Sequence, residues 1–145
     1  MLSSKIFQIL FLVYSSLLIF LGRQLDRGIT NFDGAYYAIK AREIFSSDSL
    51  WVATWMGTTR FFDNPPLPFW LTGVVYKVFG VSGYAAVFSS AIFGVLIVYL
   101  TYSLCNYLYK DNWTSFLAAF VLLFPGLFLD SSRRAMLDIT LAFFV

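Results

Sequence analysis

The charged side chains of this chain gather at the ends of its apolar segments. The residues that lie at, or just beyond, such an end are Asp33, Asp63, Arg133, Arg134 and Asp138. The sequence contains no His, so the commonest general base and the commonest metal ligand are both absent. Acid–base chemistry in this protein must therefore depend on carboxylates, tyrosines or lysines.

The rest of the composition excludes several classes of protein. A net charge of +2 is too small to indicate a nucleic-acid-binding surface. The single cysteine, Cys105, can form neither an intrachain disulfide nor a zinc site, and we expect it to be a small core residue. We predict no required cofactor. A divalent metal ion stays an alternative that no group of ligands in the sequence supports.

The segments that must position these charges are typical of a membrane protein. Hydrophobic residues make up 59% of the 145 residues and charged residues 12%, whereas soluble domains contain about 45–50% and about 25%. The chain also has 17 Phe, 9 Tyr and 4 Trp, and amphipathic rings suit a bilayer boundary. We therefore predict an all-α, multi-pass integral membrane protein.

Four apolar runs are candidates for crossing a bilayer, which needs about 20 residues. We predict spans at 6–22, 84–107, 113–129 and 135–145, the last one incomplete and truncated by the end of the sequence. The first run could instead be a signal peptide, but no small-residue cleavage site follows it, which favours a retained helix. Pro125-Gly126 predicts a kink near the far end of the third span.

The stretch 23–83 is more polar, and we predict that it forms a structured loop outside the membrane. Apolar positions at helical spacing predict a helix over 35–45, with Asp33 as its N-cap. Residues 50–62 are predicted to be extended. A helix over 67–79 should then follow Pro65-Pro66 and end at Gly80. Because it is too short to span, we expect it to lie at the membrane interface.

Alternating helix directions predict which charges share a side of the membrane. The loops after the first and third spans emerge on the same face. Residues that can meet there are Asp33, Asp63, Arg133, Arg134 and Asp138, whereas Lys110 belongs to the opposite face. The positive-inside rule leaves the absolute orientation open, because basic residues flank both faces.

Three motifs in order resemble the C-type glycosyltransferases, which include the protein O-mannosyltransferases and the aminoarabinose transferases that modify lipid A. The motifs are Asp33-Gly34-Ala35-Tyr36-Tyr37-Ala38 with Ala41-Arg42-Glu43, then Asp63-Asn64-Pro65-Pro66-Leu67-Pro68-Phe69-Trp70-Leu71, and finally Met136-Leu137-Asp138. The resemblance covers the chain from about Asn31. It implies that residues 1–145 are the N-terminal part of one such domain, with a first extracytoplasmic loop that contains short interfacial helices.

Two positions depart from the family pattern. Gly34 stands where the first motif has a second acidic residue, and Asn64 stands where the second motif has a lysine. The family uses that lysine near the lipid phosphate. Either another cation, such as Arg60 or Arg134, takes its place, or this chain recognises its donor differently.

The resemblance implies an inverting glycosyltransferase that moves a sugar from a polyprenyl-phosphate donor to a hydroxyl group of a lipid, glycan or protein. A carboxylate is suited to take the acceptor's proton, and a cation or helix N-terminus to stabilise the departing phosphate. The implied catalytic residues are Asp33, as general base, and Asp138. The implied substrate-binding residues are Tyr37, Arg60, Asp63, Asn64 and Arg134.

Four of these residues also have a purely structural interpretation. Asp33 could serve only as an N-cap and Asp138 only as a helix-start residue favoured by the helix dipole. Arg134 could anchor a helix at the membrane interface, and Asp63 could order the turn before the prolines.

Other functions stay open at this level. The alternatives are a non-catalytic transporter or lipid-binding subunit, or an inactive fragment. The nearly charge-free spans favour a reaction site in the loop over a path through the membrane. The resemblance implies a cell (inner or plasma) membrane protein whose partners are the lipid-linked donor, an unidentified acceptor and membrane lipids, with no nucleic acid.

Overall fold

The computed structural model describes residues 2–22, 29, 31–46, 54–55, 59–60 and 64–145. The elements in chain order are α1 (Leu2–Leu21), α2 (Phe32–Ser46), β1 (Thr54–Trp55), β2 (Thr59–Arg60), α3 (Leu67–Phe79), α4 (Gly83–Tyr109), α5 (Asn112–Val121), α6 (Gly126–Arg133) and α7 (Asp138–Phe144). The two short strands pair antiparallel. The predicted all-α class is confirmed, and the predicted extended stretch at 50–62 is described only at these strands.

Two helices in the described part of the chain are long and apolar enough to cross a membrane by themselves. They are the Ser4–Leu21 stretch of α1 and the whole of α4, which match the first two predicted spans. The helices α5 and α6 together make a third candidate, bent by 72° at the break between them. The chain is therefore a helical membrane protein with two or three candidate spans.

The third span differs from the predicted continuous helix. The predicted kink at Pro125-Gly126 is present, but it is a break of four residues between α5 and α6. Pro125 cannot donate a backbone hydrogen bond, so a helix stops before it and restarts after it. The restarted helix α6 runs through Asp130 to Arg133, where we predicted a polar connection; that prediction was wrong. The fourth helix begins at Asp138, three residues later than predicted.

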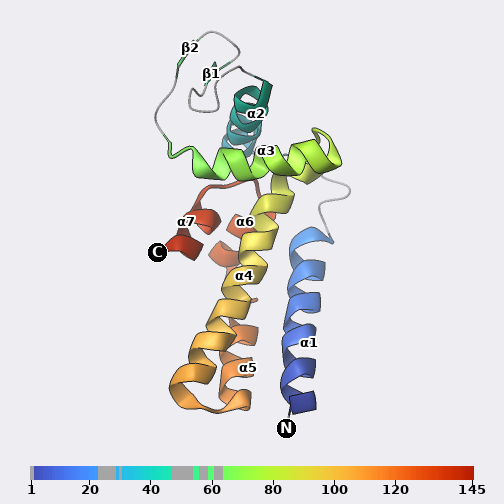
Figure 1. Cartoon of the computed structure of the whole chain (residues 1–145), viewed down its shortest axis with the longest axis vertical. Helices are drawn as coiled ribbons and strands as arrows, with labels where there is room; N and C mark the ends of the chain where they lie inside the picture. The colour runs from blue at the N-terminus through green and yellow to red at the C-terminus, as the bar shows by residue number, and fades with distance from the viewer. Residues whose placement is uncertain (1, 23–28, 30, 47–53, 56–58, 61–63) are drawn as a thin grey trace.

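The helix α4 is the centre of the bundle, and α1, α5, α6 and α7 all pack against it (Figure 1). Close approach depends on small residues of α4, among them Ser89, Ser90 and Gly94. A Cβ at Gly94 would lie 2.6 Å from Oγ of Ser132 on α6. One apolar core cluster fills this lower bundle, with Phe20, Val98 and Tyr102 among its most buried members.

A second core cluster lies above the bundle and joins α2, α3, the start of α4 and the segment before α7. The helix α3 crosses the top of α4, and α2 lies over α3 (Figure 1). The helix α3 has the predicted bounds Leu67–Phe79 and ends at Gly80. The φ angle of Gly80 is 78°, which a residue with a side chain rarely adopts. At thirteen residues α3 is too short to cross a bilayer.

The contact of α2 with α3 depends on Gly73, because α2 leaves no room for a side chain there. A Cβ on Gly73 would lie 1.8 Å from Cδ2 of Phe45. The ring of Phe45 on α2 therefore occupies the space that a side chain at position 73 of α3 would fill, and this contact fixes α2 on α3.

The opposite end of the bundle has its own polar contacts. Lys5 donates to Asn106 at 2.9 Å, and Asn106 donates to Asn112 at 2.8 Å. Asp111 caps α5 through the backbone N–H of Thr114. The amino end of α1 and the turn at Lys110 thus share one end of the molecule (Figure 1), as predicted.

Candidate active site

The predicted meeting of the first loop with the fourth helix is present in the structure. Nδ2 of Asn31 lies 3.6 Å from Sδ of Met136, across 105 positions of sequence. Asp33 follows Asn31 by two residues, and Asp138 follows Met136 by two. Both carboxylates are exposed and belong to the same end of the bundle. This end, with α2, the start of α3 and the start of α7, is called the loop face below.

Asp33 is part of α2 and does not precede it. The helix begins at Phe32, so Asp33 lies in its first turn, and the predicted N-cap position was wrong. The helix begins earlier because the backbone N–H of Ala35 already donates to the carbonyl of Asn31. A carboxylate in a first turn interacts favourably with the helix dipole, and an exposed one can reach an acceptor hydroxyl.

Asp138 occupies the corresponding position on α7. It is the first residue of that helix, and Leu137 before it makes no capping hydrogen bond through its side chain. The dipole of α7 favours a negative charge here, so the structural interpretation of Asp138 and a role in chemistry are compatible.

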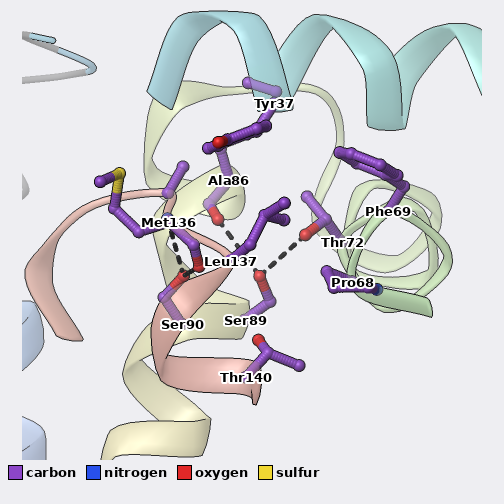
Figure 2. Close-up of a pocket in the computed structure, with 12 residues that line it drawn as sticks. Tyr37, Pro68, Phe69, Thr72, Ala86, Ser89, Ser90, Met136, Leu137 and Thr140 are labelled. Carbon is purple, nitrogen blue, oxygen red and sulfur yellow. Dashed lines mark hydrogen bonds between the residues drawn. The ribbon is translucent and has the colours of Figure 1, made fainter. Parts of the chain in front are cut away.

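Hydroxyl groups gather under the loop face, around a small cavity (Figure 2). Tyr37 of α2, Phe69 and Thr72 of α3, and Ser89 and Ser90 of α4 are among the residues that line it. The cavity has a volume of about 10 Å³, which is room for one water molecule. It is therefore a packing junction and not a substrate pocket.

Two hydrogen-bonded hydroxyl contacts hold this junction together. Oγ1 of Thr72 and Oγ of Ser89 lie 2.9 Å apart and form a hydrogen bond. Oγ of Ser90 donates to the carbonyl of Met136 at 3.2 Å and accepts from its N–H at 3.3 Å. Ser90 thus fixes the position of Met136, in the segment that leads into Asp138. The sequence did not lead us to predict this role for Ser90, although a pair of hydroxyl side chains within an apolar span was an available signal.

The predicted aromatic residue Tyr37 reaches into the same junction. Its ring comes from α2 toward Ala86 in Figure 2, and its centroid lies 6.2 Å from that of Phe69. Tyr76, two helix turns beyond Phe69 on α3, donates to the carbonyl of Ala38 at 3.4 Å. Burial raises the pKa of Tyr76 to about 12, against a smaller opposing effect of Arg42. Its phenol stays neutral at physiological pH.

The two arginines after the third span have different surroundings. Nε of Arg133 donates to the carbonyl of Ile19 at 2.7 Å, near the carboxyl end of α1, where a cation is favoured by the helix dipole. Nε of Arg134 lies 2.7 Å from a carboxylate oxygen of Asp130, and both side chains are about half exposed. Arg133 therefore ties α6 to α1, and Arg134 pairs with Asp130 one helix turn back.

The remaining predicted substrate-binding residues, Arg60, Asp63 and Asn64, precede α3 in the sequence. Asp63 lies outside the described residues, and Arg60 is described only as part of β2. Oδ1 of Asn64 is a buried acceptor with no hydrogen-bond donor among the residues described. Pro66 precedes α3 without a capping side chain, and Pro68 stands in its first turn.

Sequence reasoning missed Lys40 on α2. Its side chain is 0% exposed, and its Nζ lies 4.3 Å from the ring centroid of Tyr36 and 5.7 Å from that of Phe69. No sequence signal separates this lysine from an ordinary surface lysine, because its burial arises from the packing of α2 on α3. Within the described residues no group of three His, Cys, Asp or Glu could hold a metal ion.

Comparison with known proteins decides the family. A family model described as dolichyl-phosphate-mannose-protein mannosyltransferase matches residues 5–145. The chain belongs to this family. The resemblance that the three motifs predicted is thereby confirmed, and the family match includes all of the candidate site residues.

Curated relatives bear related names. The chain is 28% identical over 124 residues to the polyprenol-phosphate-mannose–protein mannosyltransferase of Mycolicibacterium smegmatis. The aligned segment covers 86% of this chain and 23% of that protein. It is 27% identical over 113 residues to an undecaprenyl phosphate-alpha-4-amino-4-deoxy-L-arabinose arabinosyl transferase of Proteus mirabilis, covering 78% and 20%. An uncharacterized protein of Aquifex aeolicus is 27% identical over 111 residues, covering 77% and 22%.

The chain thus spans about a fifth of the length of these relatives. No solved structure gives a significant match.

Proposed function

We propose that this chain carries the loop-face part of the active site of a membrane glycosyltransferase. The donor is a sugar linked to a polyprenyl phosphate, and the acceptor is a hydroxyl group. Membership of the mannosyltransferase family and the names of two groups of relatives support this proposal. The contact of Asn31 with Met136 supports it most directly, since it brings the segments of Asp33 and Asp138 to one end of the bundle.

The proposed reaction is a single displacement with inversion. Asp33 takes the proton of the acceptor hydroxyl as general base, and the acceptor oxygen bonds to the anomeric carbon. The bond from that carbon to the phosphate oxygen breaks, and its electron pair leaves with the polyprenyl phosphate. Asp138 holds the acceptor or a basic side chain in place. Arg134, which lies at the end of α6 beside Asp130, is one cation available to the leaving phosphate.

Polar residues beside the prolines would complete donor binding. We propose that Asn64, Asp63 and Arg60 hold the sugar phosphate and that Tyr37 borders the sugar. We further propose that the loop face lies outside the cytoplasm, on the side to which lipid-linked donors are delivered.

The test is transfer from a labelled polyprenyl-phosphate sugar by the full-length protein in nanodiscs, with Asp33→Asn compared with wild type. We expect a loss of kcat of about 10²- to 10⁴-fold, the usual worth of a general base, with an unchanged thermal unfolding midpoint. Asp111→Asn is the matched control, because Asp111 also lies at the start of a helix, as the N-cap of α5 at the opposite end of the bundle, and Asn also caps helices well. Undiminished transfer by Asp33→Asn removes Asp33 from the mechanism.

A further inference from the structure

A groove between α1 and α5 lies at the end of the bundle opposite the loop face (Figure 1). Its lining consists of side chains from the first turns of the two helices: Ser4, Phe7, Gln8, Phe11, Trp113 and Phe116. Its volume is about 300 Å³, at the lower end of the range for small-molecule sites. Phe7, Phe11 and Trp113 are 69%, 41% and 65% exposed. Because α1 and α5 belong to candidate spans, the groove opens toward the interior of the membrane.

Gln8 is the unusual member of this lining, because it is a buried amide within an apolar span. Its side chain is 5% exposed, and a polar group in an apolar environment is costly unless it is hydrogen-bonded. Oε1 accepts from the hydroxyl of Tyr102 at 3.2 Å. Nε2 donates to no acceptor among the residues that the structure describes, and neighbouring atoms do not enclose it fully. The groove therefore offers a hydrogen-bond donor to a bound molecule.

A positive charge lies between this amide and the end of the bundle. Lys5 precedes Gln8 by three residues, about 4.5 Å along the axis of α1. Its Nζ donates to Asn106 at 2.9 Å, and an ammonium has two further N–H donors. Lys110 is a second, exposed cation at this end, whereas the carboxylate of Asp111 is engaged in capping α5. The two lysines leave a net positive charge here, which favours an anionic ligand.

On the other side of the amide the groove is apolar. Phe11 follows Gln8 by three residues, again about 4.5 Å along the helix, and its ring centroid lies 5.9 Å from that of Phe116. Trp113 packs edge-on against Phe116 from the first turn of α5, and indole rings are typical of the boundary between headgroups and hydrocarbon. From the end of the bundle inward, the groove thus presents a cation, an amide donor and an aromatic wall.

This order matches one class of membrane component. A glycerophospholipid has a phosphate, then ester carbonyls, then acyl chains, in order of increasing depth in the bilayer. We propose that the groove binds such a lipid. Its phosphate lies at Lys5, and one ester carbonyl accepts from Nε2 of Gln8. One acyl chain lies along Phe11 and Phe116. A polyprenyl phosphate has no ester carbonyl, so this lipid is not the proposed donor, and the inference does not depend on the proposed function.

The experiment measures the affinity of the full-length protein, in mixed micelles, for phosphatidylglycerol and for its diether analogue, which has no ester carbonyl. The test variant is Gln8→Leu, which removes the amide and keeps a similar size. The matched control is Tyr102→Phe, which removes the hydroxyl group that donates to Gln8 and leaves Nε2 in place. The control separates the loss of the lipid's hydrogen bond from the loss of the hydrogen bond between α1 and α4.

We expect the wild type to bind the ester lipid about three- to tenfold more tightly than the diether lipid, as for one hydrogen bond. Gln8→Leu should bind the two lipids equally, and Tyr102→Phe should keep the wild-type preference. A wild type without preference, or a preference that Gln8→Leu retains, would overturn the inference. So would a wild type that binds neither lipid, because another helix of the full-length protein would then fill the groove.

The phosphate contact is tested in the same assay with diacylglycerol, which keeps the esters and acyl chains and lacks the phosphate. We expect the wild type to bind diacylglycerol about ten- to a hundredfold more weakly than phosphatidylglycerol, as for a lost interaction with a charged group. Lys5→Met should narrow this difference and Lys5→Arg should keep it. Equal binding of the two lipids by the wild type would contradict a phosphate at Lys5.

A second measurement decides if Gln8→Leu does not fold. Phosphatidylglycerol with a photoreactive group in its acyl chain is cross-linked to the wild type, and the labelled residues are located by mass spectrometry. Labelling at Phe11 or Phe116 supports the inference, and labelling confined to other helices contradicts it.

Discussion

Replacing Gly73 by Ala should separate α2 from α3 and disturb the candidate site without touching any residue proposed to act in it. The added Cβ would lie 1.8 Å from Cδ2, 2.0 Å from Cε2 and 2.7 Å from Cγ of Phe45. Carbon atoms in contact are about 3.5–4.0 Å apart. The ring must therefore withdraw by about 1.7 Å or more, and Cγ is too close to the backbone of Phe45 for a small rotation to achieve this.

The cost follows from the two ways in which the clash can be relieved. A strained side-chain rotamer of Phe45 costs about 0.5–1.5 kcal/mol, and overpacking that shifts a backbone costs about 1–3 kcal/mol. We expect Gly73→Ala to lower the free energy of unfolding by about 1–3 kcal/mol. Because α2 carries Asp33 and Tyr37, we also expect transfer to fall by more than the loss of folded protein explains.

The assay is unfolding in mixed micelles together with transfer per folded molecule, for Gly73→Ala, Phe45→Ala and the double variant. In the double variant the clash is gone, so the two effects should not add, and the double variant should be more stable than their sum predicts. Gly126→Ala is the control, since a Cβ there meets nothing within 4 Å. If Gly73→Ala is as stable and as active as wild type, the close α2–α3 contact does not exist as described.

The remaining predictions concern single groups. Asp111→Ala should lower stability, whereas Asp111→Asn should keep most of it, because both Asp and Asn cap helices. Hydrogen bonds from Thr114 hold the pKa of Asp111 below its usual value. The contribution of ionised Asp111 to the free energy of unfolding is therefore complete above about pH 4, and it is lost as the pH falls through the lower pKa of the folded state. Measuring the free energy of unfolding from pH 3 to 7 checks this. Transfer by Tyr76→Phe should keep the wild-type pH profile up to about pH 10, since Tyr76 with a pKa of about 12 does not titrate there; a changed alkaline limb would contradict this. In a background with Cys105→Ala, a membrane-impermeant maleimide should label Ser46→Cys from outside the cell and Lys110→Cys only after lysis; the reverse pattern would refute the proposed orientation.

The large apolar elements were predictable because their signal is local. Continuous apolar runs at Ile6–Leu21 and in α4 leave no alternative to spanning helices. The bounds of α3 were also predictable, because Pro65-Pro66 and Gly80 are strong local start and stop signals. These features depend on the residues themselves and not on distant contacts.

The features that depend on distant contacts were not predictable from the sequence. The stretch 130–133 is polar and resembles a loop, yet it is helical because the helix restarts after Pro125 and Arg134 pairs with Asp130 one turn back. Asp33 was expected before its helix and lies within it, because Asn31 begins the helical hydrogen bonding.

The candidate site was predicted in outline and incomplete in detail. Helix alternation correctly brought the segments of Asp33 and Asp138 to one end, since this follows from the number of spans. The burial of Lys40 and the hydrogen bonds of Ser90 to Met136 depend on how α2, α3 and α4 pack, and no spacing rule reports that packing. Lysine side chains at the surface are the usual case, which is why Lys40 was missed.

The central claim is that the chain around Asp33 and the chain before Asp138 lie together at one end of the bundle. The direct measurement is cross-linking of Asn31→Cys with Met136→Cys by a short bifunctional thiol reagent, in the full-length protein with Cys105 replaced by Ala. We predict an efficient intramolecular cross-link for this pair and none for Asn31→Cys with Tyr107→Cys, which lies at the far end of α4. Failure of the first pair to cross-link, or cross-linking of the second, would contradict the shared site.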